Sequence, residues 1–239
     1  MLQGAADAQP AGIAAGVAQE RLAGRPPGRL RIGRTKQHPV GDGTVHPDCA
    51  AAYEDASELL ASLGHDVEDV DMPFGPDAVP PFEVLWYAHA MLAPVDPAQQ
   101  DLLLPLTSYL RERGSQVTAE HLIQAQAYLQ FLVRGALAVL NGYDALLTPT
   151  LASPPVPVGY FDEVPPPENF ERQKRFTPFT PLFNVSGQPA VNVPLHWSPG
   201  GLPIGIMLAG RMGEEGTLIS LAAQLESARP WKDRHPPLW

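Results

Sequence analysis

The sequence predicts an α/β fold, in which helices flank a mixed β-sheet. Three patterns predict it. Short apolar runs of strand length alternate with longer stretches whose apolar residues recur at helical spacing. A helix, a glycine stop and a strand follow one another over residues 48–72, which is the second half of a βαβ unit in a parallel sheet. Two further strands, at residues 190–195 and 205–210, are joined by a turn.

The first elements are predicted as a strand, a helix and a second strand. The first strand covers residues 29–35. Asp48 is expected to cap the helix that follows, because its side chain can accept a bond from the free N–H groups of the first turn. Gly64 suits the left-handed residue that ends a helix. The strand over residues 65–72 is then expected to pair in parallel with the first.

The middle of the chain is expected to be helical. Apolar periodicity predicts helices over residues 82–92 and 101–113, with Pro105 able to kink the second of them. Thr118 is a good cap for a longer third helix, which ends at Gly142.

The last third of the chain returns to the sheet. A continuous apolar run over residues 143–150 predicts a central strand that is covered on both faces. The Pro-rich stretch over residues 153–167 is expected to be a loop, and so long a loop in a compact domain is more often functional than incidental. A short helix over residues 176–187 and a final helix over residues 214–226 complete the set.

Composition excludes several classes of function. The 239 residues contain 16 Lys and Arg against 26 Asp and Glu, a net charge of −10. A protein that binds nucleic acid or an anionic membrane needs a basic surface, so neither partner is expected. The single cysteine, Cys49, cannot form an internal disulfide, and no targeting or membrane-spanning segment is evident, so a cytoplasmic location is expected. One His and one Cys in "HPDC" do not make a metal site, and no cofactor motif is present.

Several motifs in order resemble the C-terminal half of the amidase signature family. They are "LGHDVEDVDMP", "YDALLTPT", "FTPFTPLFNVSGQPAVNVP", "GLPIGIMLAG" and the closing "RPW". The chain is most similar to bacterial amidases of the nylon-oligomer hydrolase type, over residues 2–239. The resemblance implies an α/β/α sandwich and hydrolysis of a carboxamide bond. It also implies a catalytic Ser, a second Ser in a cis peptide and a Lys, beside a Gly-rich loop that binds the oxyanion.

The sequence departs from the family at the catalytic residues. No two serines are adjacent, and no Gly-rich serine loop is present. The three lysines, Lys36, Lys174 and Lys232, lie outside the family's lysine context. We therefore predict that the chain carries the C-terminal portion of an amidase domain without the Ser-Ser-Lys triad, so that no catalytic residue is assigned and the chain is inactive alone. Residues 1–28 are predicted as a helical or linker segment, and residues 29–239 as the amidase portion.

Four residues are candidates for binding the substrate. Thr148 and Thr150 end the central strand, and Phe183 and Asn184 lie in the following helix; α/β folds place ligands at the ends of such strands. Plain packing is the alternative for all four. Asn184 and Gly187 are also expected to allow a left-handed backbone.

The expected partners are a small-molecule amide substrate, a separate N-terminal amidase half and, in a homo-dimer, a second copy. The alternative function is a non-catalytic binding or partner module that retains the amidase fold.

Overall fold

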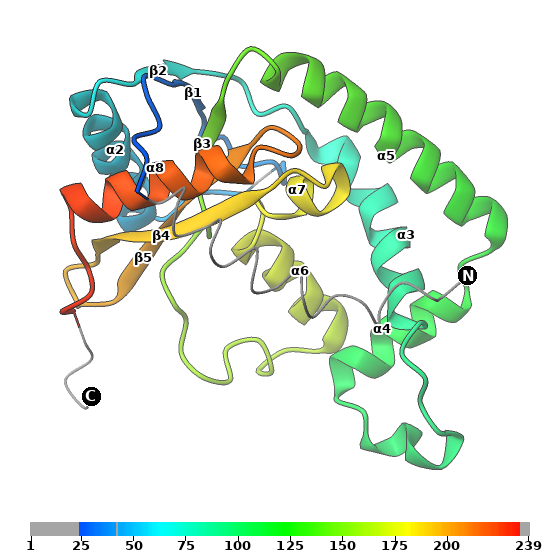
Figure 1. Ribbon diagram of the computed structural model, residues 1–239. Helices are drawn as coiled ribbons and strands as arrows, with labels where there is room; N and C mark the ends of the chain where they lie inside the picture. The colour runs from blue at the N-terminus through cyan, green and yellow to red at the C-terminus, as the bar shows by residue number, and fades with distance from the viewer. Residues whose placement is uncertain (1–23, 42, 235–239) are drawn as a thin grey trace, which may run out of the picture.

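The fold is built on one mixed five-stranded sheet. The computed structural model describes residues 24–41 and 43–234. The strands are β1 (Arg31–Arg34), β2 (Asp66–Asp69), β3 (Ala145–Pro149), β4 (Ala190–Trp197) and β5 (Pro203–Gly210), in the order β2-β1-β3-β5-β4. β1 pairs in parallel with β2 and β3, whereas β5 is antiparallel to both β3 and β4. The predicted mixed sheet is thus confirmed, including the parallel pairing of the first two strands (Figure 1).

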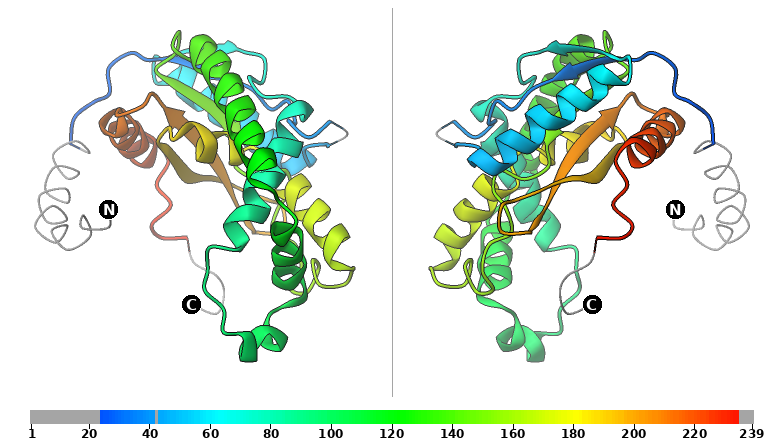
Figure 2. Two further views of the ribbon diagram at one scale, coloured as in Figure 1. Left: turned by 90° about the vertical axis from the view of Figure 1, so that its right-hand side faces the viewer. Right: turned by 90° about the vertical axis from the view of Figure 1, so that its left-hand side faces the viewer.

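Helices cover both faces of this sheet. They are α2 (Pro47–Ser62), η1 (Pro76–Ala78), α3 (Val79–Ala90), η2 (Pro97–Leu102), α4 (Pro105–Ser115), α5 (Ala119–Leu140), α6 (Pro166–Phe176), α7 (Pro181–Ser186) and α8 (Glu215–Ala228). α2 and α8 pack on one face, and α7 and the end of α5 pack on the other, as the two side views of Figure 2 show. α3, α4 and α6 form a group beside the sheet, at the lower right of Figure 1. The arrangement is the expected α/β/α sandwich.

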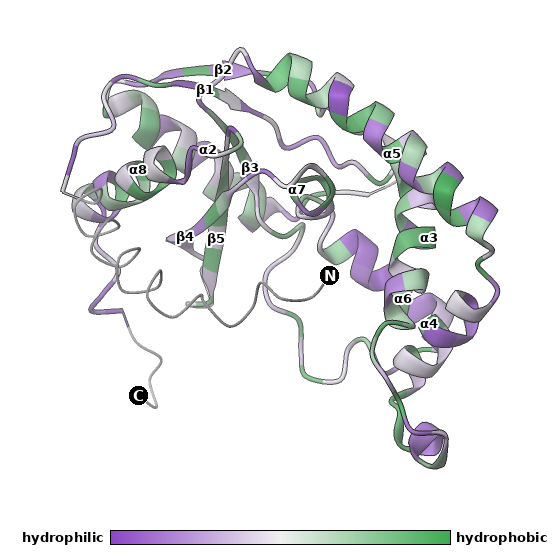
Figure 3. Ribbon diagram, turned by 45° about the vertical axis from the view of Figure 1, so that its right-hand side comes forward, coloured by the Kyte–Doolittle hydropathy of each residue, from purple (hydrophilic) through white to green (hydrophobic). Residues whose placement is uncertain are grey.

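β3 holds the two apolar layers together. All five of its residues are buried, as expected for a strand covered on both faces. Successive side chains of a strand point to opposite faces. Accordingly, Ala145 and Leu147 belong to the core under α2 and α8, while Leu146 belongs to the core under α5 and α7. In Figure 3, β3 and β5 are largely apolar, whereas the edge strand β2 is largely polar and the helices alternate between polar and apolar residues.

The helix ends correct two predictions. His46 caps α2, because its Nδ1 accepts the Asp48 backbone N–H at 3.1 Å, so the assignment of Asp48 as the cap is wrong. Asp48 instead lies in the first turn, after Pro47. Pro105 does not kink a helix but begins α4, where its missing N–H costs no hydrogen bond. Thr118 caps α5 as predicted, accepting the backbone N–H of His121.

The two glycine stops are confirmed. Gly64 follows α2 with a φ of 93°, and Gly187 follows α7 with a φ of 73°, both in the left-handed region that favours glycine. Asn184 is different: it lies inside α7 with helical geometry, so its predicted left-handed backbone is wrong.

The Pro-rich loop is shorter than predicted, because α6 already begins at Pro166. Most of the predicted segment 1–28 lies outside the described residues. Within the part of the chain that the structure describes, no helix has both the length and the apolar character needed to cross a membrane.

Candidate functional site

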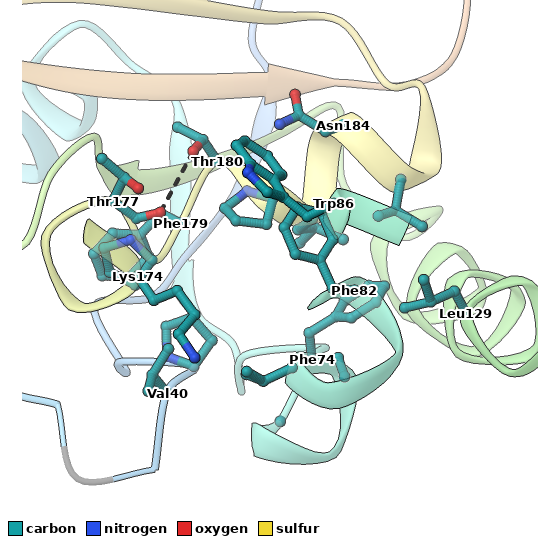
Figure 4. Close-up of a pocket in the computed structure, with 18 of the residues that line it drawn as sticks. Val40, Phe74, Phe82, Trp86, Leu129, Lys174, Thr177, Phe179, Thr180 and Asn184 are labelled. Atoms are coloured by element: carbon teal, nitrogen blue, oxygen red, sulfur yellow. Dashed lines mark hydrogen bonds between the residues drawn. The ribbon is translucent and has the colours of Figure 1, made fainter. Parts of the chain in front are cut away.

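A pocket of about 150 Å³ lies between α3, α6 and α7, beside the sheet. Its walls come from five parts of the chain (Figure 4). They are residues 39–40, residues 72–86, Leu129 of α5, residues 170–174 of α6, and residues 177–185, which include most of α7. Most of the lining is apolar, and the polar side chains are confined to α6, α7 and the segment between them.

α3 provides an aromatic wall. Phe82 and Trp86 are four residues apart, so they lie on the same side of the helix, with ring centroids 5.5 Å apart. Trp86 also contacts Phe170 of α6, at 6.5 Å between centroids. On the next position of α3, buried Tyr87 packs against Phe170 at 5.7 Å. These contacts pack α3 against α6.

Lys174 of α6 is the charged group of the lining. Its side chain is only 13% exposed, and its ammonium group contacts Glu83 of α3 and lies 2.5 Å from Glu171 of α6. It also lies 5.2 Å above the ring of Phe170. Burial alone would lower the pKa of Lys174, but the hydrogen bonds to Glu171 and Glu83 outweigh it, and the pKa is raised. Lys174 is therefore held as a cation and cannot serve as a neutral general base.

The remaining polar groups come from the segment that leads into α7. The Thr180 hydroxyl donates to the carbonyl of Thr177 at 3.5 Å, and Pro181 then begins α7. Asn184, three residues later, is exposed and borders the pocket. In Figure 4, Asn184 lies at one end of the pocket, with Lys174 on the side opposite Phe82.

Of the four predicted binding residues, Asn184 is the one that borders the pocket. Phe183 is buried in the core between α7 and the sheet. Thr148 is 1% exposed, and its hydroxyl has no hydrogen-bond partner among the described residues. By strand alternation Thr148 lies on the α7 side of β3, the side to which Leu146 points.

Thr150 makes a specific bond across the sheet. Its hydroxyl donates to Asn192 Oδ1 of β4 at 2.5 Å, although β5 runs between the two strands. The reason is Gly205 of β5: a Cβ at that position would lie 2.2 Å from Asn192 Oδ1. The missing side chain leaves the space in which Thr150 and Asn192 meet.

Other reactive side chains show no sign of activation. Burial, together with the charge of Asp48, raises the pKa of the Cys49 thiol to about 11, so the sulfur stays protonated at neutral pH. The Ser186 hydroxyl donates to the Gln188 side chain at 3.2 Å and accepts the Gln188 backbone N–H at 3.4 Å, so it belongs to a local turn after α7. Within residues 24–41 and 43–234, no group of three potential ligands could hold a metal ion.

Sequence reasoning missed the aromatic and charged lining of the pocket. The spacing of Phe82 and Trp86 was a usable signal, since it marks one face of a helix. Phe170 and Lys174 carried no such signal, because the predicted loop ends at residue 167 and the next predicted helix begins at residue 176, so that no element covers most of α6.

Comparisons with known proteins agree with this architecture. The family model described as Amidase matches residues 7–219. The chain is 32% identical to 6-aminohexanoate-cyclic-dimer hydrolase of Paenarthrobacter ureafaciens, over 89% of this chain and 46% of that protein. The enzyme of the same name from Pseudomonas sp. (strain NK87) is also 32% identical, with the same coverage of 89% and 46%.

Solved structures show the same fold. The structure of 6-aminohexanoate cyclic dimer hydrolase complexed with substrate matches with a TM-score of 0.80 and 27% identity, over 92% of this chain and 49% of that one. A bacterial aryl acylamidase of the amidase signature family shares the fold with a TM-score of 0.71. The chain spans about half the length of the relatives that it matches.

Proposed function

Because this chain belongs to the amidase family, we propose that it forms the substrate-binding wall of a carboxamide hydrolase whose Ser-Ser-Lys triad lies outside it. The observation that carries this proposal is the pocket between α3, α6 and α7: it has apolar walls and a polar rim, but no activated nucleophile or neutral base in its lining. Such a pocket can bind and orient an amide, and orientation is a large part of enzymatic rate enhancement.

The state of the lysines supports the proposal that this chain binds the substrate and that the catalytic triad lies outside it. A serine hydroxyl becomes a nucleophile when a neutral base removes its proton. Lys174 is kept protonated by two carboxylates, and Lys36 is paired with Glu54 at 2.5 Å outside the pocket. The chain alone is therefore proposed to be inactive towards amides.

The four candidate residues take different parts in this proposal. Asn184 contacts the substrate amide from the rim of the pocket. Phe183 is buried between α7 and the sheet and holds α7 in place. Thr148 and Thr150 lie at the end of β3 and shape the sheet behind the pocket: Thr148 is buried in the core, and Thr150 is bonded to Asn192.

We place the separate N-terminal amidase half at β4, the strand that ends the sheet on the side of β5. An edge strand has unpaired backbone N–H and C=O groups, to which a further strand can add. The alternative function is a binding module that retains the amidase fold and binds an amide without turnover.

Two assays distinguish these functions. Hydrolysis of a simple aryl amide is measured on the 239-residue chain alone, and on the same chain preceded by the Gly-rich serine segment and lysine of the family. We expect turnover only in the second case. Serine-dependent hydrolysis by the chain alone would refute the proposal, and so would the absence of turnover in a folded long form that still binds amides.

A further inference from the structure

We propose that the Glu83–Lys174–Glu171 cluster makes this pocket select uncharged amides and reject carboxylates of the same chain length. The inference rests on the proposed function, since it assigns the ligand class of the same pocket. Lys174 is the charged side chain of the lining, and a lone lysine in an apolar pocket would be an anion receptor. In this structure Glu83 and Glu171 pair with Lys174, so that it does not act as an anion receptor.

First, Lys174 already has two carboxylate partners. Its ammonium group contacts Glu83 from α3 and Glu171 from α6, and its face over Phe170 is covered by the aromatic ring. A ligand carboxylate would have to displace one of these glutamates. The Glu83 side chain is 23% exposed, so it would be left partly buried without its cation, which is costly.

The second step is the local charge. Two carboxylates and one ammonium group leave the cluster with one excess negative charge. Across the mainly apolar lining of the pocket, that charge repels a second anion more strongly than it would in bulk water. The whole chain is also acidic, at −10, so no long-range attraction offsets the repulsion.

The third step is what the pocket offers in place of charge. Gln173, Thr177, Thr180 and Asn184 of the lining supply neutral donors and acceptors. Phe82 and Trp86 supply an apolar surface, and Phe82 lies on the side opposite Lys174 (Figure 4). An amide with an apolar chain matches both kinds of group, because an amide both donates and accepts hydrogen bonds without a net charge.

Binding of two isosteric probes tests the proposal. Hexanamide and hexanoate are titrated into the full chain at neutral pH by calorimetry, and Trp86 fluorescence reports the location, with Trp86→Phe as the check that the signal arises in the pocket. We expect hexanamide to bind and hexanoate to bind about tenfold more weakly. In Glu83→Gln, which keeps a hydrogen-bond partner for Lys174 but removes the excess charge, the difference should fall to about twofold while hexanamide binding is unchanged.

Glu58→Gln is the matched control. Glu58 is exposed on α2, on the far side of the sheet, and its replacement changes the net charge of the chain equally. It should leave the preference intact. Should Glu83→Gln fail to fold, Glu171→Gln removes the same charge from α6. Equal affinity of the wild-type chain for the two probes, no binding of either, or a preference unchanged in the charge variants would each overturn the inference. None of these results depends on turnover: lost selectivity with hexanamide binding retained overturns the inference and leaves the proposed function standing, whereas no binding of either probe counts against both.

Discussion

At the scale of single residues, Gly205 shows why the apolar strands near the end of the chain carry glycine and asparagine. Gly205→Ala would place a methyl group 2.2 Å from Asn192 Oδ1 and separate it from Thr150. We expect a loss of about 1–3 kcal/mol in the free energy of unfolding, because neither the strand nor the amide can move away freely. Urea denaturation measures it. Gly200→Ala is the control, since its nearest neighbour would be at an ordinary 3.7 Å, and it should change stability little.

Single residues were also where sequence reasoning was weakest. His65 has a structural role that depends on distant partners: its Nδ1 accepts the Leu30 backbone N–H at 3.2 Å, and its Nε2 lies 2.9 Å from the Gln224 side chain. The partners themselves were not predictable, because Gln224 is 159 residues away. The cap of α2 was misassigned for a similar reason, since His46 and Asp48 both precede an apolar helix and only the backbone geometry decides between them.

At the scale of elements, replacing either of two helical glycines with alanine should change the stability in opposite directions. Gly114 of α4 faces α3, where an added Cβ would lie 2.3 Å from the Tyr87 carbonyl oxygen. Gly114→Ala should therefore destabilise the chain by about 1–3 kcal/mol, because α3 and α4 must move apart. Gly135 of α5 has open space around it, so Gly135→Ala should stabilise the chain by about 0.5–1 kcal/mol through helix propensity. Thermal unfolding of the two variants compares them directly, and two shifts of the same sign would contradict this account.

An ion-pair cluster between α2, β4 and the end of α8 predicts how the stability of the fold depends on pH. Asp55 of α2 accepts from Arg229 after α8, at 3.0 Å from Nη2, and from His196 of β4 at 3.1 Å. Burial would raise the pKa of Asp55, but the hydrogen bonds from Arg229 and His196 outweigh it and hold the pKa below its usual range. A carboxyl whose pKa is lower in the folded chain stabilises the fold above its unfolded pKa of about 4 and loses this effect as the pH falls through the folded pKa.

Asp55→Asn tests that coupling. The variant should be less stable than the wild type at about pH 5 and above, and the difference should shrink as the pH falls below about 4, through the lowered pKa of Asp55 in the folded chain. Urea denaturation across this range measures the difference. A gap that stays constant down to the acid limit would mean that Asp55 contributes by packing alone.

The elements that the sequence predicted have a clear apolar pattern, which α6 lacks. The strands at 145–149 and 203–210 and the helix at 119–140 have apolar patterns set by burial against the sheet. α6 is mostly polar and turns only a few side chains inward, Asn169 and Phe170 being its buried residues. Its helix is fixed instead by contacts with α3, the ion pair from Lys174 to Glu83 among them, and such contacts span 91 residues of sequence. The pocket was not predictable either, because its walls come from segments that are far apart in sequence and lie together only in the folded chain.

At the scale of the whole molecule, the two edges of the sheet differ in charge. β2 carries Asp66, Glu68 and Asp69, each paired with an arginine in or next to β1, and charges on an edge strand oppose the addition of another strand. β4 has no Asp, Glu, Lys or Arg between Ala190 and Trp197. Pro194 removes one N–H donor from it but leaves the first half, from Ala190 to Val193, able to pair.

This difference predicts that the isolated chain associates with itself through β4. A charge on an edge strand disfavours pairing, and Ala190 is exposed, so Ala190→Lys should lower the associated fraction several-fold without a change in the unfolding transition. Ala61→Lys, an exposed position near the end of α2, adds the same charge away from the edge and should leave association unchanged. Light scattering over a range of protein concentrations measures the associated fraction. A wild-type chain that stays monomeric at high concentration would show that β4 is already protected, and equal effects of the two lysines would show that net charge, rather than the strand edge, controls association.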